Sequence, residues 1–200
     1  MLRALDGVRW EALVRPGKRC GIGARVTLAS GAAQATVLDH RGRGARVVEI
    51  DAPWPVDELL ERHGLPPLPP YIERHQAPKP EDRERYQTVY ATASGSVAAP
   101  TAGLHFTPIL LERLASAGIE LHRLTLHVGP GTFRPLTGSR VEEHRLEAEI
   151  ADVPAVTAEA VNRAKAEGRR VVAVGTTTTR TLEWSADASG RVRERRGEAD

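Results

Sequence analysis

Three short segments combine glycine or threonine with a histidine or an arginine, and this combination suits a ligand site. They are residues 95–106, which contain His105, residues 125–135, which contain His127, and residues 175–180, which end in an arginine. Glycine lets a backbone approach a ligand closely, and loops held by a rigid scaffold commonly carry binding groups. We therefore expect the three segments to line one site.

The histidines near these segments are candidates for acid–base chemistry. His105 and His127 lie inside two of the segments, and His144 follows the acidic residue Glu143. Imidazole titrates near neutral pH, so it serves readily as a general acid or base. The same groups form a possible zinc donor set, but no two histidines have the His-x-His or His-x-x-x-His spacing. We expect acid–base work without a metal, and purely structural histidines remain the alternative.

The third segment has the groups that receive an anion. Residues 175–180 follow an expected strand and enter an expected helix, so backbone N–H groups point outward there. The hydroxyls of Thr176 and Thr177 and the guanidinium of Arg180 add donors for a carboxylate or a phosphate. An ordinary helix cap beside a surface arginine is the alternative. The turn at residues 129–131 matches neither the dinucleotide fingerprint nor a Walker loop, and we expect it to be a rigid wall for a ligand.

The order of elements after residue 81 predicts an α/β domain. Apolar patterns predict strands over residues 119–128 and 170–174, with a helix over 157–166 between them. Thr107 followed by Pro108 predicts the start of an earlier helix. A strand–helix–strand unit of this kind is parallel and right-handed, and ligands bind beyond the carboxyl ends of such strands. We therefore expect a partly parallel sheet flanked by helices, with two of the three segments at its carboxyl edge.

The first part of the chain has a different pattern. Residues 1–50 contain short strand-like stretches separated by glycine-rich turns, which predicts a small antiparallel, β-barrel-like module. Residues 51–80 predict a helix over 56–63 and then a proline-rich linker, because successive prolines favour an extended chain. The expected organisation is a β-module over 1–50, this linker, and an α/β domain over 81–200.

Composition limits the class of protein. The single cysteine, Cys20, excludes an internal disulfide framework, and no apolar run is long enough to cross a membrane. We expect a cytoplasmic monomer. Residues 1–50 hold nine Lys and Arg against four Asp and Glu. This basic module suits an anionic polymer such as RNA, and simple solvation of the arginines is the alternative.

Two motifs carry a resemblance to a known family. Ala-Pro-Thr-Ala-Gly-Leu-His-Phe at residues 99–106 precedes Thr-Leu-His-Val-Gly-x-Gly-Thr-Phe at residues 125–133, and Glu-Glu-His follows at residues 142–144. In this order they resemble the S-adenosylmethionine:tRNA ribosyltransferase-isomerases of queuosine biosynthesis. The resemblance implies a pentosyl-transferring enzyme. It would move and isomerise the ribosyl moiety of S-adenosylmethionine onto 7-aminomethyl-7-deazaguanine in tRNA, giving epoxyqueuosine and releasing adenine and methionine.

The resemblance also implies roles for named residues. The expected partners are tRNA and the co-substrate S-adenosylmethionine, with no metal and no membrane. The first module would help to seat the tRNA, and the methionine carboxylate would meet the third segment. The implied catalytic residues are His105, His127, Glu143 and His144; the implied binding residues are Thr101, Gly103, Gly129, Gly131, Thr132, Arg134, Thr176, Thr177 and Arg180.

The sequence departs from the family pattern in three ways. Pro130 replaces a small or aliphatic residue, and Glu147 stands where the family tends to carry a further histidine. Family members also have segments before and after the stretch that this chain resembles, so we expect a fragment with open sheet edges. A catalytically silent nucleotide- or RNA-binding protein, and then a metal-dependent hydrolase, are the alternatives.

Overall fold

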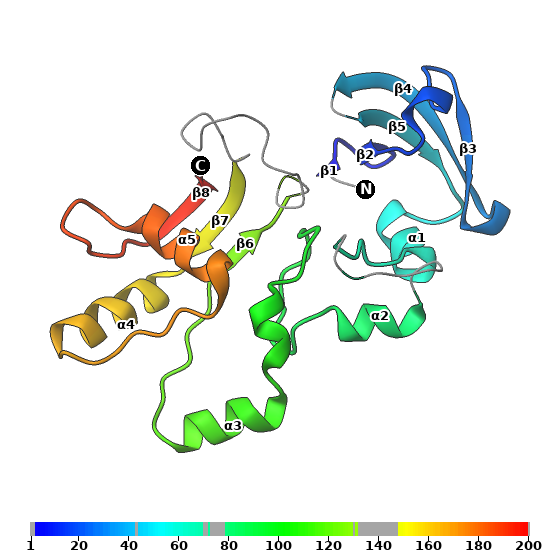
Figure 1. Ribbon diagram of the computed structural model, residues 1–200. Coiled ribbons are helices and arrows are strands. Elements are labelled where there is room, and N and C mark those ends of the chain that lie inside the picture. Colours follow the sequence, from blue (N-terminus) through cyan, green and yellow to red (C-terminus); the bar gives the residue numbers. More distant parts are fainter. Residues whose placement is uncertain are drawn as a thin grey trace. The chain divides into compact units, whose positions relative to one another are not determined.

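The chain divides into two compact units, Met1–Leu65 and Pro66–Asp200. The division falls inside the stretch expected to be a linker. Within the described residues, no helix combines the length and the apolar character needed to cross a bilayer. The structure, a computed structural model (Figure 1), describes residues 3–42, 44–69, 72, 79–129, 131 and 148–199.

The first unit is one antiparallel sheet with a helix. The strand order is β1-β2-β5-β4-β3, and the turns η1 (Gly17–Arg19) and η2 (Ala29–Gly31) precede β3 and β4. Helix α1 (Val56–His63) follows β5. The strands are β1 (Arg3–Ala4), β2 (Arg9–Leu13), β3 (Arg25–Leu28), β4 (Ala33–Gly42) and β5 (Ala45–Asp51).

Side-chain alternation builds the core of this unit. In β4, Ala33, Ala35 and Val37 are buried, while the residues between them face outward or are only partly covered. This is the period of two that a half-buried strand requires. Val56 and Leu59 of α1 belong to the same core cluster, so the helix contributes to the packing of the sheet.

The second unit holds a three-stranded sheet and most of the helices. The sheet order is β6-β7-β8, formed by β6 (Thr125–His127), β7 (Glu149–Val153) and β8 (Arg195–Ala199). Helix α5 lies across this sheet and contacts all three strands (Figure 1). The other elements are α2 (Pro80–Arg85), the turn η3 (Thr101–His105), α3 (Pro108–Ser116) and α4 (Ala155–Ala166), with α5 spanning Gly175–Ser185.

The predicted fold class is wrong. Both sheets are antiparallel, and among the described residues no parallel strand pair and no closed barrel exists. The expected α/β arrangement needed residues 170–174 as a buried strand, but this stretch pairs with no described strand, and Val171 and Val172 are 42% and 79% exposed. Strand β6 instead pairs with β7, with Leu126 opposite Ala151. An apolar run shows only that burial is favourable; the available neighbours decide whether it becomes a strand.

The helices predicted from the sequence agree with the structure better than the predicted strands do. Helix α1 has the expected bounds, and α3 begins at Pro108 after Thr107, whose Oγ1 accepts a hydrogen bond from the N–H of Leu110 at 3.1 Å. A threonine cap before a proline is a local signal, and it needs no distant partner. Helix α2 ends at Arg85, and α5 begins at Gly175, inside the third segment, which was expected to lead into a helix.

The packing of Val37 in the first unit can be tested through the free energy of unfolding. Val37 is 1% exposed, so Val37→Ala removes two buried methyl groups and leaves a cavity. We expect the free energy of unfolding to fall by roughly 1.5–3 kcal/mol in urea titrations followed by circular dichroism. Val8→Ala, at a site that is 50% exposed in the same unit, is the matched control. Equal losses in both variants would contradict this core assignment.

Candidate active site

The first and second segments lie side by side. The N–H of Val97 donates to the carbonyl of Val128 at 2.9 Å. The hydroxyl of Ser96 donates to the carbonyl of Leu126 at 3.1 Å and accepts the N–H of Val128 at 2.9 Å. These bonds satisfy the backbone at the end of β6 and hold residues 95–97 beside it. The structure thus joins two stretches that are about 30 residues apart in the chain.

The third segment meets the first at the start of α5. Gly175 has a positive φ of +85°, and a Cβ placed on it would lie 3.4 Å from the Cβ of Ala102 in η3. This is an ordinary contact distance, so the two segments are neighbours and the positive φ is the reason for glycine at this position. The structure brings all three segments together in one unit. What they bind stays a prediction.

His127 is packed against a glycine. A Cβ on Gly95, whose φ is +133°, would lie only 2.8 Å from the Nδ1 of His127. This Nδ1 is buried and has no hydrogen-bond partner within the described part of the chain. A buried polar atom without a partner is costly, and such atoms often mark a functional group or a place for a ligand.

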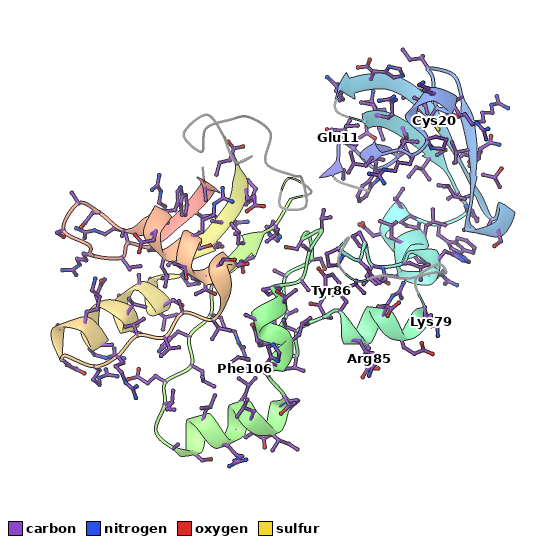
Figure 2. All side chains as sticks on the ribbon, in the orientation of Figure 1. Glu11, Cys20, Lys79, Arg85, Tyr86 and Phe106 are labelled. Carbon is purple, nitrogen blue, oxygen red and sulfur yellow. The ribbon has the colours of Figure 1, made fainter. Side chains whose placement is uncertain are left out.

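His105 ends η3, beside a tightly packed glycine. Gly103 is buried, and a Cβ on it would overlap the hydroxyl of Tyr90 and lie 2.8 Å from the Cγ2 of Thr88. The Tyr90 ring contacts Phe106 edge-on at 6.5 Å, and burial raises the pKa of the Tyr90 phenol. Phe106 lies where the chain turns from η3 into α3 (Figure 2). His105 itself is exposed, so its imidazole is open to solvent.

Arg180 has a partner that the sequence did not indicate. Its Nη1 lies 2.7 Å from Oε2 of Glu149, and its Nη2 donates to the carbonyl of Ala199 at 3.0 Å. The other oxygen of Glu149 accepts the N–H of Gly129 at 2.8 Å. Glu149 is 6% exposed. The one available signal was its place in β7, where it shares the buried face of Ala151 and Val153.

The first turn of α5 has no side-chain cap. Val174 occupies the N-cap position without a capping hydrogen bond, and Thr176 and Thr177 follow it. The hydroxyls of Thr178 and Thr179 donate back to the carbonyls of Val174 and Gly175, so they are used inside the helix. Thr176 is exposed and Thr177 is partly exposed, and both lie at the end where an anion is stabilised.

Several candidate residues fall outside the described part of the chain. Thr101 is exposed, and Gly129 and Gly131 are partly buried near the end of β6. In the described ranges, no group of three His, Cys, Asp or Glu side chains is placed to hold a metal ion. The predicted absence of a metal stays a prediction, because Glu143 and His144, two of its possible ligands, are not described. The candidate residues outside the described part are Thr132, Arg134, Glu143 and His144.

Comparison with known families agrees with the motifs. A family model described as queuosine biosynthesis protein matches residues 1–200. The chain belongs to this family. The resemblance that the motifs indicated is therefore confirmed.

Relatives of known sequence have one shared name. The chain is 47% identical over 193 residues to the S-adenosylmethionine:tRNA ribosyltransferase-isomerase of Pelotomaculum thermopropionicum, covering 96% of this chain and 55% of that protein. It is 48% identical over 200 residues to the protein of the same name from Desulfitobacterium hafniense, covering 100% and 58%. The chain thus spans a little over half the length of these relatives.

One solved structure of a similar protein also aligns. It is the S-adenosylmethionine tRNA ribosyltransferase of Thermotoga maritima, 27% identical, with 92% of this chain and 45% of that chain covered and a TM-score of 0.30.

The packing around Gly103 gives a prediction for this queuosine-family site. Gly103→Ala forces a methyl group against Tyr90 and Thr88, so we expect the second unit to lose about 1–3 kcal/mol of stability. Thermal unfolding followed by circular dichroism measures this loss. Gly197→Ala is the control, because its Cβ would make an ordinary contact at 3.8 Å with Trp184. Indistinguishable unfolding of the two variants would contradict the packing described for Gly103.

Proposed function

We propose that this chain contains the reaction site of an S-adenosylmethionine:tRNA ribosyltransferase-isomerase. The ribosyl moiety of S-adenosylmethionine is transferred and isomerised onto 7-aminomethyl-7-deazaguanine in tRNA, which gives epoxyqueuosine with release of adenine and methionine. The observation that supports this most is that residues 95–106, 125–129 and 175–180 meet in one unit. Relatives whose alignments span 96% and 100% of this chain carry that name.

The two candidate histidines that the structure describes, His105 and His127, have different environments, and we assign proton transfer to them. The reaction removes a proton from the ribose carbon next to sulfur, and adenine leaves more easily when it receives a proton. The Nδ1 of His127 is buried without a described partner, so a ligand group is a favourable neighbour for it. His105 is exposed at the end of η3 and can exchange protons with solvent. Glu143 and His144 complete the proposed catalytic set.

The proposed binding groups come from the same three segments of the chain. Thr176 and Thr177, at the uncapped start of α5, receive the methionine carboxylate through hydroxyl and backbone N–H groups. Arg180 is already bound to Glu149 and to the carbonyl of Ala199, so we assign it a supporting role, with Thr176 and Thr177 as the direct contacts of the anion. The remaining proposed contacts to S-adenosylmethionine or tRNA come from Thr101, Gly103, Gly129, Gly131, Thr132 and Arg134.

The first unit is the proposed contact for the tRNA backbone. Arg15, Lys18 and Arg19 are all exposed and lie within one short loop around η1. Arg46 holds this loop in place, because its guanidinium donates to the carbonyls of Cys20 and Gly17 at 3.2 and 3.4 Å. Clustered cations on a fixed loop suit phosphate groups, which bind mainly through charge.

Substitution of the two histidines tests the proton-transfer proposal. We expect His105→Ala and His127→Ala each to lower turnover by about 10²–10⁴-fold, because each removes a proposed acid or base. Turnover is adenine release from S-adenosylmethionine in the presence of precursor-modified tRNA. His122→Ala, at an exposed histidine bonded to Glu120, is the control and should keep its activity. Full turnover in both test variants would remove the assignment.

Substitution of the basic loop tests the tRNA contact. The triple change Arg15→Gln, Lys18→Gln and Arg19→Gln should weaken tRNA binding at low salt. It should also flatten the dependence of log K on log salt by roughly 0.7–0.9 per lost phosphate contact. Filter binding over a salt series measures both effects. The double change Arg113→Gln and Lys165→Gln removes exposed cations of the second unit as a control. A salt dependence identical to that of the unsubstituted protein would place the contact elsewhere.

A further inference from the structure

Glu149 is a buried carboxylate whose two oxygens contact two different parts of the site. Oε1 accepts the N–H of Gly129 at 2.8 Å, and Oε2 lies 2.7 Å from Nη1 of Arg180. Gly129 belongs to the second segment and Arg180 to the third. A side chain of the sheet therefore connects the two segments, which are about 50 residues apart in the chain.

The sheet fixes the position of this carboxylate. Glu149 pairs with Ala199 across β7 and β8, and Arg180 donates to the carbonyl of the same Ala199 at 3.0 Å. Arg180 is thus held at two points on one strand pair, which sets the position of α5 over the sheet. A charge buried to this degree is tolerated only when its partners are well placed, so both contacts are constrained.

The constraint reaches the proposed reacting groups. Gly129 follows His127 by two residues, and the intervening Val128 is bonded to Ser96. The carbonyl of Thr177, in the first turn of α5, accepts a hydrogen bond from the hydroxyl of the fully buried Thr181. The first turn of α5 is therefore tied to the part of the helix that contains Arg180. A shift of the Glu149 carboxylate would therefore change the distance between His127, at the end of β6, and the first turn of α5.

We infer that Glu149 is a positioning residue of the site, one that sets the spacing between the loop after β6 and the first turn of α5. This inference rests on the proposed function for its effect on substrate. The alternative is a plain ion pair that contributes only to stability. The two roles require different properties of the side chain at position 149. Positioning requires a side chain long enough to contact both Gly129 and Arg180, whereas stability requires only a negative charge near Arg180.

Two substitutions separate these alternatives. Glu149→Gln keeps the length of the side chain but replaces one acceptor oxygen by an NH₂ group. In one of the two contacts this NH₂ group then faces another hydrogen-bond donor, so that hydrogen bond is lost. Glu149→Asp keeps the charge but is one carbon shorter, so it cannot span both partners. Glu198→Gln changes an exposed glutamate of the adjacent strand β8 and is the matched control. If Glu149→Gln does not fold, the double variant Glu149→Gln/Arg180→Gln, which leaves no unpaired charge, replaces it.

The experiment has one readout on substrate and one on the protein alone. We expect both Glu149 variants to raise the Kd of S-adenosylmethionine by about 10- to 100-fold, the usual effect of a misplaced binding group. We expect amide hydrogen exchange at Gly129, followed by NMR without substrate, to accelerate by about 2- to 10-fold, as for the loss of one hydrogen bond. Glu198→Gln should change neither quantity.

The outcomes distinguish failure of the inference from failure of the proposed function. Glu149→Asp with unchanged Kd and unchanged Gly129 exchange would show a plain ion pair and overturn the positioning role. Faster Gly129 exchange with unchanged Kd would show that this loop does not position substrate, and would also overturn it. Absence of S-adenosylmethionine binding by the unsubstituted protein would instead overturn the proposed function.

Discussion

The ion pair between Glu149 and Arg180 connects the loop after β6, the sheet and α5 of the second unit. A carboxylate in a buried strand must have partners for both oxygens, and here those partners come from the end of β6 and from α5. Because Arg180 also bonds to Ala199, the same interaction joins β7, β8 and the helix. The geometry of the site therefore depends on one buried charge.

Close packing of glycines complements this charge. Gly95 leaves room for the imidazole of His127, and Gly103 leaves room for Tyr90 and Thr88. Any side chain at these positions would push the histidine or the tyrosine out of place. Glycine at positions 95 and 103 is thus explained by close contacts with neighbouring side chains, in addition to any contact with a ligand.

The sequence predicted local features well and long-range pairing poorly. Thr107 and Pro108 defined the start of α3 because capping involves only neighbouring residues. The strand over residues 170–174 was wrong because apolar character does not specify a partner, and Val172 lies largely exposed. For the site, the sequence selected His127 and the three segments, but it missed Glu149, whose importance depends on two residues that are distant in the chain.

By itself, the sequence determined the family, because two specific motifs occur in it together and in a fixed order. It also determined which short segments carry histidine, threonine and glycine. Only the tertiary structure decided that both sheets are antiparallel, that the Nδ1 of His127 is buried, and that Arg180 is bound to a carboxylate. The physical reason is that residue type and spacing are local properties, whereas strand direction, burial and charge pairing arise from contacts between segments that only folding brings together.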